Sequence, residues 1–223
     1  MREGIRVDGY TALWAAVVAS GLYHGLNPGM GWPLAVAAGL TERRGSAVAR
    51  TLVPLAAGHL ISIAMVLLPF AALTLLLDWS REIRIGAGIG IIAFAAVLAL
   101  YPRHPRWMTR IRPRQVALWS FAVGLLHGAG LMLVPVLLGL CAIPSAMPEG
   151  FMAAESGGAT NAGLALAVAV THTAALIAAS GGLAWVVFRV LGLEVLTRSW
   201  LDLSRIWAGS LGLAGAVGLW AAL

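Results

Sequence analysis

Long apolar runs separated by short polar stretches dominate the pattern of this chain. Six such runs cover about residues 10–40, 47–77, 84–101, 115–141, 160–188 and 204–222. A helix that crosses the apolar core of a bilayer needs about 17–25 residues, so each run is long enough to cross it once. The pattern therefore predicts an all-α polytopic membrane protein with six transmembrane helices.

The first run is too long for one straight span and too short for two, and Asn27-Pro28-Gly29 interrupts it. Proline removes a backbone hydrogen-bond donor and glycine loosens the helix, so a break is expected here. Backbone groups freed inside a membrane need a protein-lined or wet cavity. We therefore expect Pro28 and Gly29 to form a moving gate beside such a cavity.

Composition also indicates a membrane protein. Apolar residues make up 60% of the chain and charged residues 11%, whereas a soluble domain carries about 25% charged residues. The fifteen basic residues are all Arg and lie in the loops, so the net charge of +6 reflects membrane topology and not nucleic-acid binding. The lipid bilayer is the expected partner. The single Cys141 excludes an internal disulfide.

The distribution of Arg predicts the orientation. In a six-span layout, four Arg residues lie on one side and eleven on the other. The eleven are Arg43, Arg44, Arg50, Arg103, Arg106, Arg110, Arg112, Arg114, Arg189, Arg198 and Arg205. Because Arg-rich loops stay in the cytoplasm, we expect both termini outside a bacterial-type inner (plasma) membrane. Residues 102–114 would be a cytoplasmic Arg-rich linker.

Two short patterns recur in the same order in both halves of the chain. The sequence Gly-Leu-x-His-Gly occurs at residues 21–25 and again at 124–128. The pattern Trp-x4-Arg-Ile-x-Ala-Gly begins at Trp79 and again at Trp200. The first run therefore corresponds to the fourth, and the third to the sixth.

This correspondence predicts two three-helix repeats, at residues 1–101 and 115–223, joined by the linker 102–114. With three spans in each half, the second copy enters the membrane from the opposite side. The result is an inverted-topology repeat, which is the layout of many secondary transporters.

Four histidines fall inside apolar runs, at matched places in the two halves. They are His24, His59, His127 and His172. Each lies roughly ten to fourteen residues from the start of its run, which at about 1.5 Å per residue is near the middle of the bilayer. A titratable ring at that depth is costly, so the two pairs predict one shared midplane site.

Neutral imidazole is a common ligand of nickel, cobalt, copper and zinc, and no Asp or Glu lies in a run core. We therefore expect a transporter of a transition-metal ion, and not an enzyme, with the four histidines as metal ligands. Asn27 and Ser62 each follow one of these histidines by three residues and are expected to support the site. Met30 is a candidate soft ligand, and Thr173 is a further supporting residue.

A second hypothesis is a membrane electron-transfer protein that binds haem b through two of the histidines. Facing helices with glycine beside three of the four histidines suit bis-His ligation. This would make the protein a membrane oxidoreductase. A membrane hydrolase is disfavoured because neither HExxH nor GxSxG occurs in the chain.

Residues 24–30, His-Gly-Leu-Asn-Pro-Gly-Met, resemble the H-G-x-x-P-G-H element of the nickel/cobalt (transition-metal) efflux branch of the lysine-exporter superfamily. His172-Thr173-Ala174 is similar to a Ser-His-Thr segment late in that branch. The resemblance implies six spans in two inverted halves, export of a metal ion or small solute, and metal-facing roles for His24 and His172. Met30 stands where the branch has its second histidine, and the long His-rich loop of many members is lacking. A homodimer is one assembly to consider.

Overall fold

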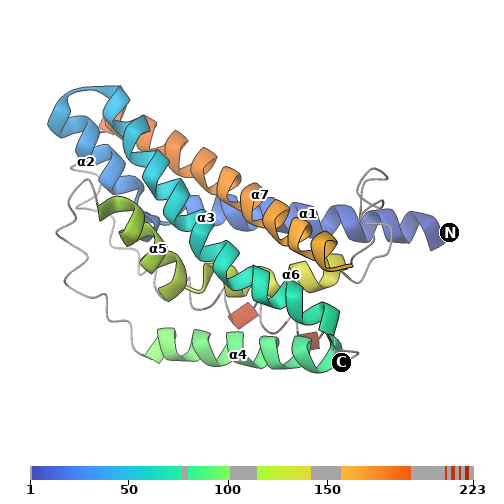
Figure 1. Cartoon of the computed structure of the whole chain (residues 1–223). Helices are drawn as coiled ribbons and strands as arrows, with labels where there is room; N and C mark the ends of the chain where they lie inside the picture. The colour runs from blue at the N-terminus through green and yellow to red at the C-terminus, as the bar shows by residue number, and fades with distance from the viewer. Residues whose placement is uncertain are drawn as a thin grey trace.

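The computed structural model describes residues 2–76, 80–100, 115–141 and 157–191, together with positions 209, 212–213, 216 and 219–220. Within these residues every regular element is helical, which confirms the all-α class. In chain order (Figure 1) they are α1 (Arg2–Leu26), η1 (Pro28–Met30), α2 (Trp32–Glu42), α3 (Gly45–Leu76), α4 (Ser80–Leu100), α5 (Val116–Leu126), α6 (Ala129–Cys141), α7 (Gly157–Val186) and η5 (Val187–Leu191). The short η1 is a 3-10 turn, and η5 is a π-helical end to α7.

Two of the described stretches, Gly45–Ala72 and Asn161–Val190, are long and apolar enough to cross a membrane. A third is added if α5 and α6, which are bent by 62° at their junction, are taken as one broken span. These stretches support the membrane class. The six spans, the inverted repeat and the orientation stay predictions, and both the linker 102–114 and most of 204–222 lie outside the described residues.

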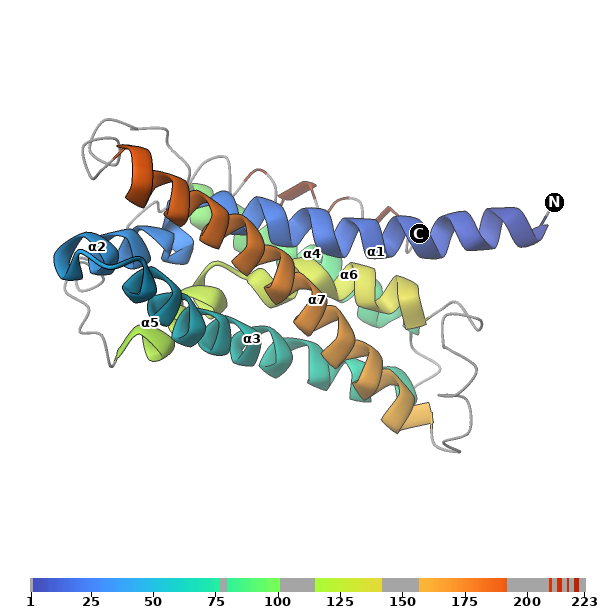
Figure 2. The ribbon, with the colours of Figure 1, turned by 90° about the horizontal axis from the view of Figure 1, so that it is seen from above.

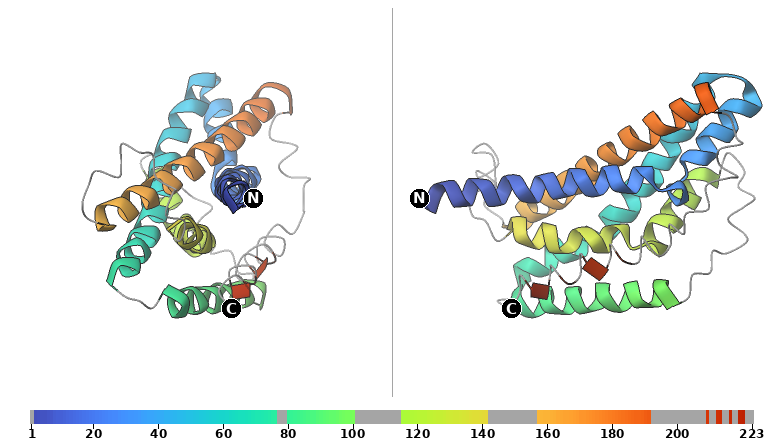
Figure 3. Two further views of the ribbon diagram at one scale, coloured as in Figure 1. Left: turned by 90° about the vertical axis from the view of Figure 1, so that its right-hand side faces the viewer. Right: turned by 180° about the vertical axis from the view of Figure 1, so that it is seen from behind.

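Three long helices form the centre of the molecule. Helix α7 runs beside α3 in Figure 1 and crosses α1 in Figure 2, and it packs against both of them. Helix α3 also packs against α5 and α6, and α4 lies along the outside next to α6 (Figure 3). This arrangement brings α1, α3 and α7 together, and these are the three long helices that each carry one of the matched histidines.

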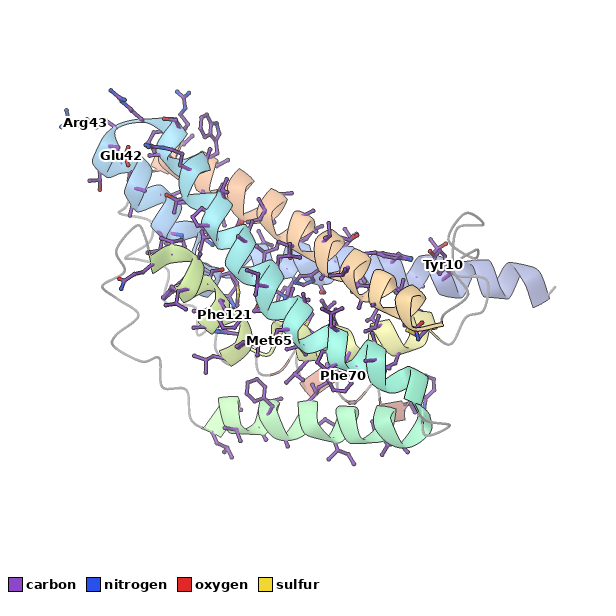
Figure 4. All side chains as sticks on the ribbon, in the orientation of Figure 1. Tyr10, Glu42, Arg43, Met65, Phe70 and Phe121 are labelled. Carbon is purple, nitrogen blue, oxygen red and sulfur yellow. The ribbon has the colours of Figure 1, made fainter. Side chains whose placement is uncertain are left out.

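The largest apolar cluster lies between α1, α3, α6 and α7 and includes the fully buried Val17, Ile63, Leu133 and Val168. Apolar side chains also face outward, as Met65 does with 59% of its surface exposed (Figure 4). A helix that is apolar on all sides is typical of a membrane span, because its outer face contacts lipid tails. The turn with Glu42 and Arg43 lies at the opposite end of the molecule from Tyr10 (Figure 4).

Glycines let the central helices touch backbone to backbone. A Cβ atom at Gly21 or Gly25 of α1 would collide with the carbonyl oxygens of His172 and Leu176 in α7. Likewise, a Cβ at Gly58 of α3 would collide with a backbone carbonyl of α5. Small residues at such crossings are a common means of packing membrane helices, since lipid offers no hydrophobic drive for their association.

Candidate histidine site

Three of the four matched histidines meet in the middle of the bundle. His24 comes from α1, His59 from α3 and His172 from α7, and each ring is at most 2% exposed. The ring centroids are 4.9 Å apart for His24 and His172, 5.7 Å for His59 and His172, and 5.8 Å for His24 and His59. We call this nearly equilateral group the histidine triangle. It joins residues that are up to 148 positions apart in the chain.

The fourth, His127, lies where α5 ends and the chain bends into α6. Its Nδ1 donates to the carbonyl oxygen of Val123 at 3.0 Å, and the ring is half-buried. A Cβ built on Gly29 would lie 3.7 Å from the Nε2 atom of His127. His127 therefore faces the interruption after α1.

The glycine contacts around the triangle are alike in the two halves. A Cβ at Gly21 would meet the backbone of His172 and the Cβ of Ala175. At Gly124, which holds the same place in the repeated pattern, it would meet Nδ1 of His59 at 3.4 Å and the side chain of Ser62. Each glycine thus lies against a histidine of a neighbouring helix and against the residue three positions after that histidine.

The Nε2 atoms of the triangle are enclosed by the protein. The Nε2 atoms of all three rings are buried, and among the described residues those of His59 and His172 have no hydrogen-bond partner. Burying a polar atom without a partner costs roughly 1–3 kcal/mol. The triangle therefore favours a ligand that supplies such a partner.

The nitrogen atoms do not converge on one point, however. Among the described residues, no group of three or more His, Cys, Asp or Glu side chains is arranged to hold a metal ion. The rings of His59 and His172 are nearly parallel, with 18° between their planes. Because a nitrogen lone pair lies in the plane of its ring, one of these stacked rings would have to turn relative to the other before both could bind the same ion.

Two of the four residues predicted to support the histidines hydrogen-bond the backbone instead. Asn27 Oδ1 accepts from the backbone N–H of Gly29 at 2.9 Å, and Ser62 Oγ donates to the carbonyl oxygen of His59 at 2.7 Å. Met30 is buried in an apolar cluster that also includes Trp119. Thr173 is buried as well, and its hydroxyl has no partner among the described residues.

The interruption after α1 is present where the sequence places it. Asn27 is extended, Pro28 and Gly29 form the 3-10 turn η1, and Gly31 has a positive φ of 100° before α2 begins. The indole Nε1 of Trp32 donates to the carbonyl oxygen of Leu26 at 3.2 Å. The protein thus satisfies a carbonyl at the end of α1 that the break leaves without an intrahelical partner.

Sequence reasoning missed Ser20. Its Oγ lies 2.8 Å from Nδ1 of His172, and its carbonyl oxygen accepts a hydrogen bond from Nδ1 of His24 at 3.1 Å. The available signal was its position, one helical turn before His24 and on the same face. Among the residues that the structure describes, Ser20 is the one that hydrogen-bonds two rings of the triangle.

Comparisons of the chain with protein-family models, curated proteins and solved structures found no match. The similarity to the lysine-exporter superfamily therefore rests on residues 24–30 and 172–174 and stays a prediction.

Proposed function

We propose that this chain is a multi-pass inner-membrane transporter that binds a transition-metal ion at the histidine triangle. The observation that carries the proposal is the triangle itself: three buried imidazoles from three helices, with centroids 4.9–5.8 Å apart. His24, His59 and His172 are the proposed ligands. His127 is proposed as a further ligand or as a neighbour on the ion's path, because it faces the break after α1.

The size of the triangle suits a metal ion. The point equidistant from the three ring centroids lies about 3 Å from each, which is the separation expected when a metal–nitrogen bond of about 2 Å joins an ion to an imidazole. The spacing is therefore already suitable, and binding requires the ring of His59 to turn about its Cβ–Cγ bond relative to that of His172. Such a site takes up an ion only when its side chains reorient.

The charge around the triangle favours a monovalent ion. Imidazoles are neutral ligands, and no Asp or Glu lies in the apolar core of any predicted span. A divalent ion would bring uncompensated charge into a low-dielectric setting, unless water entered with it. Cu(I) is a transition-metal ion with a single charge, and imidazole is among the ligands that suit copper.

Transport needs a moving part, and the break at Pro28 and Gly29 is our candidate gate. It lies directly after the helix that carries His24, and it faces His127. The matching glycine contacts at Gly21 and Gly124 support the inverted repeat, in which two halves rock around a shared midplane site.

The haem alternative fits the triangle less well. Two axial histidines lie on opposite faces of a flat macrocycle. The third ring is within 6 Å of both others, so for any axial pair it would occupy the space of the porphyrin.

Metal analysis and a visible spectrum of the gently purified protein test the proposal. We expect Cu(I), Ni(II), Co(II) or Zn(II) to bind wild type at about one ion per chain, with no Soret band. His104→Ala, in the linker outside the described residues, is the control and should bind as wild type does. Absence of binding for all four ions would overturn the proposal, and a Soret band would select haem.

A further inference from the structure

Ser20 links two of the three rings through two different groups. Its backbone carbonyl accepts from Nδ1 of His24, and its hydroxyl is paired with Nδ1 of His172 on the facing helix. Among the described residues, Ser20 is the one whose side chain hydrogen-bonds a triangle ring that belongs to another helix.

A hydrogen bond at one imidazole nitrogen determines what the other nitrogen can do. A carbonyl oxygen only accepts, so the bond to Ser20 requires a proton on Nδ1 of His24. In the neutral ring, Nε2 of His24 then carries a lone pair. A serine hydroxyl both donates and accepts, so Ser20 can pair with either tautomer of His172. Only the tautomer with its proton on Nδ1 offers Nε2 of His172 to an ion.

We propose that Ser20 is a positioning residue for ion binding: its hydroxyl accepts the Nδ1 proton of His172 and so keeps Nε2 as the ion-binding atom. The inference rests on the proposed function of the triangle. Metal-binding histidines commonly donate their other ring nitrogen to an oxygen, and removal of that oxygen costs about 10–100-fold in metal affinity.

The second half of the chain shows why the hydroxyl is informative. Val123 holds the place of Ser20 in the repeated pattern, and its carbonyl accepts from Nδ1 of His127 at 3.0 Å, as that of Ser20 does from His24. The backbone bond is therefore common to both halves. Val123 has no hydroxyl, so the side-chain bond from Ser20 has no equivalent from Val123 and makes His172 different from its counterpart His59.

The test compares Ser20→Ala and Ser20→Thr with wild type in histidine-¹⁵N-labelled protein. The ¹⁵N shifts of Nδ1 and Nε2 report the tautomer of each ring, and the spectrum of His172→Ala identifies the signals of His172. Affinity for Cu(I) and for Ni(II) is measured on the same samples. The control is Ser120→Ala, because Ser120 is a serine of the same bundle, buried where Ser20 is half-buried, that donates its hydroxyl to the carbonyl oxygen of Leu55 at 2.7 Å.

We expect Ser20→Ala to shift the two nitrogen signals of His172 and to lower ion affinity about 10–100-fold. Ser20→Thr should restore both, and Ser120→Ala should change neither. Unchanged His172 signals in Ser20→Ala, or changed signals with unchanged affinity, would overturn the inference. If wild type binds neither ion while the His172 signals still shift in Ser20→Ala, the hydrogen bond is verified and the proposed function is what fails.

Discussion

The two helix breaks, at residues 27–31 and at 127–128, lie at matching Gly-Leu-x-His-Gly sequences, but the first follows its motif and the second falls within it. After His24 the helix continues to Leu26, and the chain then passes through a 3-10 turn with Gly31 at a φ of 100°. In the second half the helix ends at once, because Gly128 takes a φ of 68° directly after His127.

The position of the break decides what its histidine can reach. His24 is still inside a helix, so its ring is held in the triangle and is fully buried. His127 is the last residue of its helical turn, and its half-buried ring faces the first break. Two copies of one short pattern therefore give one central ring and one peripheral ring.

The largest expected difference between the two halves of the chain is in their accessibility from the two sides of the membrane, where labelling is either complete or absent. If they are inverted copies, a cysteine introduced at position 108, in the linker, should be labelled only from the inside. A cysteine at position 152 should be labelled only from the outside. Both positions lie outside the described residues, and Cys141 is first replaced by Ala as the background. Labelling of both from one side would contradict the six-span layout.

The two breaks should respond unequally to alanine. At Gly31→Ala the positive φ costs about 1–2 kcal/mol, and the new Cβ would also lie 2.6 Å from Leu55 and 2.7 Å from Trp119. Overpacking of this kind adds about 1–3 kcal/mol. We expect Gly128→Ala to lose about the first amount, because its φ of 68° lies in the left-handed region that alanine can enter at that cost. Denaturant unfolding in detergent measures the loss in free energy of unfolding for both variants. Equal losses would contradict tighter packing around the first break.

Removal of the central ring should weaken ion binding more than removal of the peripheral one. We expect His24→Ala to lose at least about 100-fold in Cu(I) affinity, more than the loss of a supporting oxygen, and His127→Ala about tenfold. Leu22→Ala is the control, because Leu22 lies on α1 with 43% of its surface exposed. Calorimetry or bound-metal content decides the order. Wild-type affinity in His24→Ala would remove His24 from the site.

The smallest effect concerns the turn itself. Asn27→Ala deletes the hydrogen bond from the Gly29 N–H to Oδ1, and the loss of such a cap costs about 0.5–2 kcal/mol. Ion affinity should stay within about twofold of wild type, since Asn27 bonds the backbone and not a ring. A large loss of affinity without a loss of stability would restore Asn27 as a direct ligand.

Much of this arrangement could be predicted from the sequence. The apolar runs require helices, Pro28 and Gly29 require a break, and the repeated histidines indicate a shared centre. The second break could not be predicted, because Gly25 and Gly128 are both the last residue of the same motif and only Gly128 leaves the helix. Glycine adopts positive and negative φ about equally readily, so the packing around each glycine decides whether the helix continues or ends there.

The side-chain roles were also beyond reach of the sequence. Asn27 and Ser62 lie one turn from histidines, yet both hydrogen-bond nearby backbone, as short polar side chains often do. The bond of Ser20 to His172 spans 152 positions and depends on the close crossing of α1 and α7. Ring orientation likewise follows from packing, so the sequence predicted a shared histidine site but not which three rings would lie together or where their nitrogen atoms would point.

The hydrogen bond from the Trp32 indole to the Leu26 carbonyl has a practical consequence. This bond joins the start of α2 to the end of α1 across the break. Any rearrangement of residues 27–31 therefore changes the surroundings of that indole. The chain has nine tryptophans, but fluorine labelling and comparison with Trp32→Phe would isolate this signal. Trp32 therefore provides a spectroscopic reporter, already in place, for the state of the first break while ions are added or removed.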